Sequence, residues 1–292
     1  MLKMLLGAVS ALTLSLAPVP AAAQDADPAL WVVKDRDTTI YLFGTVHVLK
    51  PGLSWFDEAV RKAFDKSGEV RIETIEPDLP TLQALIVRLA LNPAGPAVTQ
   101  QLPEDKRAAY GDALVEAGLP RNGLDPLDPW FSAITLSIAL LPKYGYDPES
   151  GADKVIAKAA KAANKPVSAF ETPEQQLGYF DGLPIDAQLK LLVATIDAVP
   201  QMHANLDKMV ANWAKGDTKA LATDLKQDLG VTPEITRALI TDRNARWADW
   251  IAGRMAQPGT LFIAVGAGHL AGPDSVQKFL RNHHLHAHRI RY

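Results

Sequence analysis

Residues 41–47 read YLFGTVH, and residues 263–269 repeat the arrangement as IAVGAGH. Each stretch is an apolar run of strand-forming residues that ends in the spacing Gly-x-x-His. Residues 261–265 are apolar without interruption, which is typical of a strand buried on both faces of a sheet. Because the two matched strands lie near opposite ends of the chain, they predict a central sheet to which both ends contribute.

Two further strands are followed by glutamates. Residues 70–72 lead into Glu73 and Glu76, and residues 166–170 lead into Glu171. The order along the chain is therefore strand–His, strand–Glu, strand–Glu, strand–His. Ligands of open α/β sheets bind outside the carboxyl ends of the strands. If these four strands are neighbours and point the same way, two imidazoles and two carboxylates converge at one edge of the sheet.

The remaining pattern predicts helices around that sheet. Residues 30–33 and 39–43 flank a polar turn, as in a β-hairpin. The spacing of apolar residues predicts helices over residues 55–63, 130–141, 151–163, much of 173–256, and 273–280, and a last strand over residues 286–291. We therefore predict an α/β fold, with a central mixed sheet flanked by helices and a helical insertion at about residues 79–145.

The first 23 residues have the pattern of a signal peptide. A short basic start is followed by an apolar run over residues 4–16 and by small residues at 21–23. We predict cleavage after Ala23, a single domain over residues 24–292, and a periplasmic or secreted protein. The alternative is an uncleaved anchor, although the apolar run is shorter than the roughly 20 residues that span a bilayer. No later stretch is long and apolar enough to cross a membrane.

Composition narrows the possible functions. The 292 residues include 30 Lys and Arg against 33 Asp and Glu, a formal net charge of −3. This balance argues against nucleic acid as a partner, because phosphate binding needs a concentrated basic surface. There is no cysteine. Disulfides, thiol nucleophiles, cysteine-ligated zinc and iron–sulfur clusters are therefore excluded.

The strand-end residues are a possible metal site. Two histidines with one or two carboxylates commonly hold Zn²⁺, Mn²⁺, Co²⁺ or Fe²⁺, and a further carboxylate can act as general base. The alternative is that each histidine is a hydrogen-bonded structural residue. Similarly, Thr172, Pro173 and Gln175 have the pattern of a helix start with a capping box, which accounts for part of the second glutamate motif without any site.

Other residues allow two interpretations each. Arg243 could bind a substrate carboxylate or an oxyanion, or it could pair with Asp242 or with a carboxylate at a strand end. Asp153 could belong to the site or could favour the first turn of its helix. His283, His284, His286 and His288 form a C-terminal cluster. On a strand, His284, His286 and His288 would share one face, where adventitious metal binding is plausible.

Several short motifs together resemble the TraB/GumN family, which includes the pheromone-shutdown proteins and the animal Tiki proteins. The pieces that carry the resemblance are, in order, residues 30–31 (LW), 41–47 (YLFGTVH), Glu73, 146–153 (YDPESGAD), 170–172 (FET), 176–177 (QL), 213–217 (WAKGD), 242–244 (DRN) and 264–272 (AVGAGHLAG). The match looks closest to the bacterial GumN-like branch. It implies a fold similar to erythromycin esterases and the haem-binding ChaN proteins, and a metal-dependent hydrolase site.

The resemblance implies roles for five residues. His47 and His269 match the motif histidines, Glu73 matches the glutamate that follows the strand, and Glu171 and Arg243 match further recurrent polar positions. We expect His47, Glu73 and His269 to bind the metal, and Glu73, Glu171 and Arg243 to take part in catalysis. The strand before Glu73 departs from the family because it contains Arg71, which shares a face with Glu73 by strand alternation and could pair with it. Glu76 would then be a substitute.

We therefore expect a metal-dependent hydrolase of the cell envelope, and among hydrolases we favour a peptidase. It would use a divalent metal (Mn, Co, Zn or Fe) and act on a peptide or small-molecule substrate. One alternative is a non-enzymatic binder of haem, metal or peptide. Another is an accessory protein of exopolysaccharide production. The sequence leaves the metal, the substrate and the oligomeric state open.

Overall fold

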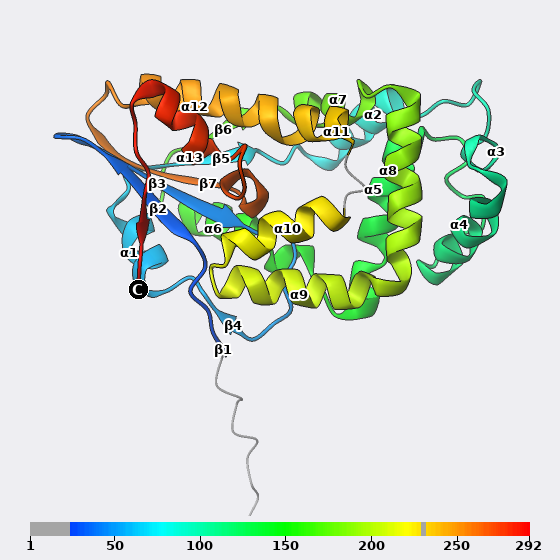
Figure 1. The fold of residues 1–292 in the computed structure, drawn as a ribbon, viewed down its shortest axis with the longest axis horizontal. Helices are drawn as coiled ribbons and strands as arrows, with labels where there is room; N and C mark the ends of the chain where they lie inside the picture. The colour runs from blue at the N-terminus through cyan, green and yellow to red at the C-terminus, as the bar shows by residue number, and fades with distance from the viewer. Residues whose placement is uncertain (1–23, 229–231) are drawn as a thin grey trace, which may run out of the picture.

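A computed structural model describes residues 24–228 and 232–292, so the predicted signal peptide lies outside the described residues. Its main sheet has six strands in the order β6-β5-β7-β3-β2-β8 (Figure 1). The first four run parallel, whereas β2 and β8 add antiparallel strands beyond β3. The strands are β2 (Leu30–Lys34), β3 (Thr38–Thr45), β5 (Glu69–Thr74), β6 (Val167–Glu171), β7 (Gly259–Gly266) and β8 (His288–Ile290), and a separate parallel pair is formed by β1 (Gln24–Asp25) and β4 (Leu53–Ser54).

The central position of β7 follows from its sequence. Residues 261–265 are all buried, because β5 and β3 flank the strand and helices cover both of its faces. β3 pairs with β7 along its whole length, from Thr38 opposite Gly259 to Thr45 opposite Gly266. The mixed α/β class is thus confirmed. The four strands with polar ends are parallel neighbours, which is the condition for their polar groups to converge.

Helices cover both faces of the sheet, and alternate strand residues point to opposite layers. Phe43 and Phe262 pack towards one layer, which contains α1, α6, α9 and α10. Leu42 and Ile263 pack towards the other, which contains α12 and α13 (Figure 1). These helices are α1 (Glu58–Lys66), α6 (Ala152–Ala162), α9 (Met202–Ala214), α10 (Thr218–Asp228), α12 (Asp242–Arg254) and α13 (Val276–Leu280).

A helical lobe with its own apolar core lies at the far end of the sheet (Figure 1). The predicted insertion, residues 79–145, supplies α2 to α5, but the lobe is wider because α8 packs against α5 and residues 235–240 add to the same core. Its helices are α2 (Leu79–Leu89), α3 (Val98–Gln101), α4 (Glu104–Glu116), α5 (Pro129–Ala139) and α8 (Ile185–Ala198), and α7 (Pro173–Asp181) and α11 (Pro233–Thr236) join it to the sheet.

The apolar stretch at residues 130–141 forms α5 and the turn that follows it. Trp130 and Leu136 are fully buried, as expected for a helix inside a bundle. Across residues 24–228 and 232–292, no helix has both the length and the apolar character needed to cross a membrane.

Candidate functional site

Three of the predicted residues surround Gly266 at the carboxyl end of β7. A Cβ built on Gly266 would lie 3.1 Å from Oε1 of Glu73, 3.6 Å from Cδ2 of His269 and 3.8 Å from Nε2 of His47. A side chain at residue 266 would therefore fill the space between these groups. Glycine leaves that space open, and we call it the Gly266 cradle.

Arg243, near the start of α12, connects the glutamates with one of the histidines. Its Nη2 donates to Oε2 of Glu73 and to Oε2 of Glu171, both at 2.8 Å, and its Nε donates to Oε1 of Glu171 at 2.9 Å. Its Nη1 lies 3.1 Å from Nε2 of His269. Of the two sequence interpretations of Arg243, the structure contains the ion pair, and it involves both strand-end glutamates.

Glu171 is the most completely bonded member of this network. Besides Arg243, the hydroxyl of Tyr179 donates to its Oε1 at 3.2 Å and Nε1 of Trp247 does so at 3.1 Å. The Glu171 side chain is only 4% exposed. Glu171 therefore fixes the guanidinium of Arg243 in place.

The capping box predicted at Thr172 is also present and begins α7.

His269 follows β7 on a short 3₁₀ turn, Ala267–Leu270, and is buried. Because a guanidinium can only donate, Nε2 of His269 accepts from Arg243. We therefore assign the ring proton to Nδ1, which donates to Oδ1 of Asn244 at 2.6 Å. Burial lowers the pKa of His269 from its ordinary 6.5 to about 4, so the ring is neutral at neutral pH.

His47 lies on the opposite side of the cradle, and its side chain is 69% exposed. Its Nδ1 lies 3.3 Å from Oδ2 of Asp153. The hydrogen bond to Asp153 raises the pKa of His47 from 6.5 to about 9. The imidazole of His47 therefore carries a positive charge at neutral pH.

Glu73 lies between the two histidines and stays ionised. Its Oε1 accepts the backbone N–H of Gly266 at 2.6 Å. Burial alone would raise the pKa of Glu73, but the positive charges that His269, Arg243 and His47 carry at low pH, together with that N–H, lower it to about 2. A carboxylate that is only 13% exposed is therefore held as an anion beside the cradle.

Arg71 and Glu76 lie outside this network. The guanidinium of Arg71 lies 3.8 Å from the ring centroid of Trp250, and its Nη2 donates to the carbonyl oxygen of Ala169 at 2.6 Å. The expected pairing of Arg71 with Glu73 is therefore wrong, because aromatic stacking draws Arg71 towards the edge of the sheet. Glu76 is exposed and pairs with Lys154 at 3.2 Å.

The donor chemistry of the cradle suits a divalent metal, but the ligands are not assembled around one point. Oε1 of Glu73 and Nε2 of His269 are 3.7 Å apart, a separation that two ligands at about 2.0–2.2 Å from one ion can have. In the part of the chain that the structure describes, however, no three histidine, aspartate or glutamate side chains form a ready metal site. Metal binding by His269 would require Nε2 to give up its hydrogen bond from Arg243.

The C-terminal histidines likewise form no ready metal site among the described residues. His283 is hydrogen-bonded to Asp249 at 2.9 Å, His284 lies in a left-handed turn, and His288 begins β8. The chain turns here before the short strand begins, so the expected common face does not form.

Several residues of the network had no predicted role. Asn244, Trp247, Gln176 and Tyr179 all bond to the predicted residues. A π-helical turn, Arg237–Thr241, precedes α12, and the carbonyl of Leu239 in this turn accepts Nη1 of Arg243 at 3.1 Å. For Trp247 the sequence did contain a signal, because it lies four positions after Arg243 and therefore on the same face of a helix.

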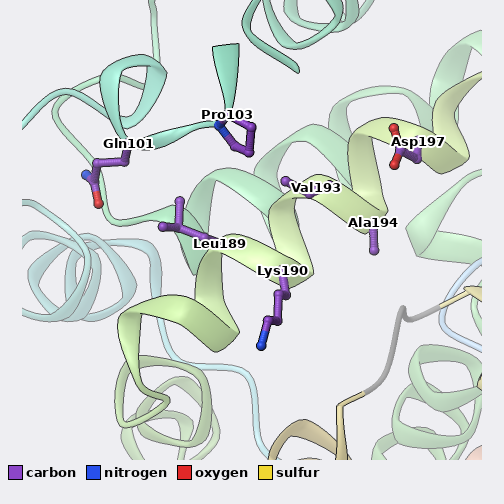
Figure 2. Close-up of a pocket in the computed structure, with 7 residues that line it drawn as sticks. All are labelled: Gln101, Pro103, Leu189, Lys190, Val193, Ala194 and Asp197. Carbon is purple, nitrogen blue, oxygen red and sulfur yellow. The ribbon is translucent and has the colours of Figure 1, made fainter. Parts of the chain in front are cut away.

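The cradle is separate from the surface pocket in Figure 2. That pocket, of about 470 Å³, lies on α8 in the helical lobe, and its walls are mainly apolar. It is lined by Gln101, Pro103, Leu189, Lys190, Val193, Ala194 and Asp197. None of these residues belongs to the polar network.

The fold and the network define an α/β protein with a polar site at the carboxyl ends of parallel strands. The chain belongs to the TraB/PrgY/gumN family, whose family model matches residues 29–288. It is also 21% identical to an uncharacterized protein of Treponema pallidum (strain Nichols) over 294 aligned residues, which cover 94% of this chain and 86% of the relative. No solved structure gives a significant match.

Proposed function

We propose that this protein is a metal-dependent hydrolase of the cell envelope that cleaves a peptide bond. The observation that carries the proposal is the grouping of His47, Glu73 and His269 around the Gly266 cradle. These residue types are common ligands of Zn²⁺, Mn²⁺, Co²⁺ and Fe²⁺, and the cradle lies where α/β proteins bind their ligands.

His47, Glu73 and His269 would hold the metal. When bound, a divalent cation supplies Lewis-acid polarisation of a carbonyl and activation of water for attack. Glu73 is better placed than Glu171 to accept a proton, because Oε1 of Glu73 faces the cradle and accepts only the backbone N–H of Gly266 among the hydrogen bonds described. Oε1 of Glu171 already accepts from Arg243, Tyr179 and Trp247.

Arg243 would stabilise the negative charge that develops on the substrate. Its N–H groups point to Glu73, Glu171, the carbonyl of Leu239 and His269. If His269 turns its Nε2 to a metal, one Nη1–H of Arg243 loses its acceptor beside the cradle. A donor held in place by Glu171 is suited to an oxyanion, because it needs no reorganisation during the reaction.

The proposed setting is the periplasm or the exterior of the cell. Residues 1–23 would direct export and be removed after Ala23, and the substrate would be a peptide or a small molecule. The charge balance of the chain supports a partner other than nucleic acid.

One observation favours a second candidate, a peptide binder without catalytic activity. Both carboxylates and His269 already have hydrogen-bond partners, so each of these three groups would have to give up a partner to act as a base. A binder would use this network as a rigid floor under the ligand. A non-enzymatic haem or metal binder, or a decayed site in exopolysaccharide production, has no comparable support.

The test is metal-dependent cleavage of a peptide library by the full chain, purified without a histidine tag. The control is His47→Ala/His269→Ala, which keeps all the C-terminal histidines. The proposal predicts about one additional bound metal per wild-type chain and cleavage that the variant lacks. Equal metal content in both proteins, with no cleavage in the presence of Mn²⁺, Co²⁺ or Zn²⁺, would overturn it.

A further inference from the structure

We infer that residues 147–153 form a clamp that positions His47, with Asp153 as the residue that orients its ring. The inference rests on the proposed function, because it concerns how one of the three proposed ligands is aimed at the cradle. It also gives a role to the YDPESGAD stretch, which has no part in the mechanism above.

The clamp begins with backbone contacts to the loop that carries His47. The N–H of Asp147 donates to the carbonyl of Leu49 at 3.2 Å, and the N–H of Ala152 donates to the carbonyl of Val46 at 2.8 Å. The clamp and the loop therefore meet on both sides of residue 47. The position of the loop depends on a segment about 100 residues away in the sequence.

Gly151 allows this close approach. A Cβ on Gly151 would overlap the carbonyl oxygen and carbon of His47, closer than side chains normally come to a backbone. The backbone of Gly151 itself is ordinary, with φ at −55°. Glycine is therefore needed here for space and not for an unusual conformation.

Asp153 lies in the first turn of α6 and bonds to His47 through Oδ2. Its other oxygen, Oδ1, is buried and has no hydrogen-bond partner among the described residues. With Nδ1 of His47 facing Asp153, the nitrogen left to face the cradle is Nε2. His269 has the same arrangement, since Asn244 holds its Nδ1. A carboxylate on the second nitrogen fixes the orientation of a ligand histidine and increases its basicity.

The rival explanation is that Asp153 only stabilises the first turn of α6 through the helix dipole. That explanation predicts a small loss of helix stability when Asp153 is replaced. It predicts no change in metal affinity and no movement of the His47 ring.

The experiment is a titration of the full chain with Co²⁺, followed by visible absorption, in the wild type and three variants. We expect Asp153→Ala to weaken Co²⁺ binding by about 10–100-fold. Gly151→Ala should also weaken it, because its Cβ displaces the histidine loop. The matched control is Glu149→Gln, which removes an exposed acidic side chain of the same clamp that pairs with Lys154 and Lys158. Glu149→Gln should bind Co²⁺ as the wild type does.

A crystal structure of metal-free Asp153→Ala provides a second measurement that does not depend on metal. We expect the His47 ring to leave its position beside Gly266. If Asp153→Ala binds Co²⁺ as tightly as the wild type, or the ring keeps its position, the inference is wrong. If the wild type itself binds no Co²⁺, the proposed metal site fails, and the position of the ring alone decides the inference.

Discussion

The two Gly-x-x-His histidines stand in opposite surroundings, although each follows an apolar parallel strand. His269 is buried, neutral at neutral pH and bonded on both nitrogens, to Arg243 and to Asn244. His47 is exposed and paired with Asp153, and its pKa is raised to about 9 whereas that of His269 is lowered to about 4. The same short motif therefore produces two different charge states.

The two histidines differ because one side of the candidate site is closed and the other is open to solvent. The His269 side is a closed network in which each charge has a partner, as buried charges require. The His47 side is open and rests on one hydrogen bond and a clamp. We expect changes on the closed side to reduce stability, and equivalent changes on the open side to alter the orientation of His47 with little effect on stability.

Removal of the central cation should have the largest effect. Arg243→Met leaves Glu73 and Glu171 buried without their partner, and we expect a loss of about 3–5 kcal/mol in the free energy of unfolding. Urea denaturation measures it. The matched control is Arg246→Met on the same helix, because Arg246 is exposed and donates only to Tyr179 among the hydrogen bonds described. A loss below about 1 kcal/mol for Arg243→Met would contradict the closed network.

Acid should weaken the closed side through His269. The folded-state pKa is lowered, so the unfolded chain binds a proton first as pH falls from 6.5 towards 4. The contribution of His269 to stability is therefore complete above pH 6.5, and it should decline by up to about 3 kcal/mol as pH falls across this window. Urea denaturation at several pH values should show a slope that His269→Gln lacks. Equal slopes in the two proteins would show that His269 is not held neutral.

A matched pair of substitutions compares the two sides directly. Asn244→Ala removes the acceptor for Nδ1 of a buried histidine, and we expect a loss of about 1–3 kcal/mol. Asp153→Ala removes the acceptor for Nδ1 of the exposed histidine, and we expect less than about 1 kcal/mol. Thermal unfolding of both variants gives the comparison. Equal losses would mean that burial does not distinguish the sides.

The smallest effect should appear in alkali. The raised pKa of His47 means that its contribution is complete below pH 6.5 and is lost as pH rises towards 9. Because the side chain is mostly exposed, we expect less than about 1 kcal/mol after solvent screening. The midpoint temperature of thermal unfolding should decline slightly over this pH range in the wild type, and it should not decline in His47→Gln. A larger decline in the variant would contradict the assignment.

Much of the fold could be predicted because it depends on local pattern. The unbroken apolar run at residues 261–265 marks the central strand, and the polar residues after each strand mark the edge of the sheet at which the candidate site lies. The wider helical lobe was not predictable from residues 79–145, because α8 joins it through contacts between segments far apart in sequence.

The residues of the candidate site could be predicted from the sequence, but their hydrogen-bond partners could not. His47, Glu73, Glu171, Arg243 and His269 all carry visible motifs. Their charge states depend on burial and on partners between 25 and 170 positions away, such as Asn244 for His269 and Arg243 for Glu73. Nothing in the sequence next to Arg71 indicated that Trp250 would draw it away from Glu73.

The most direct test of the metal site is an NMR titration of the histidine rings with Zn²⁺ at neutral pH. The chain has seven histidines, and His47→Gln and His269→Gln assign the two that matter. Without metal, we predict a neutral His269 ring protonated on Nδ1 and a positively charged His47 ring. One equivalent of Zn²⁺ should then shift both rings together, as His47 releases its Nε2 proton to the solvent and each Nε2 binds the ion. If neither ring responds, or if only the C-terminal histidines do, the two motif histidines do not form a metal site.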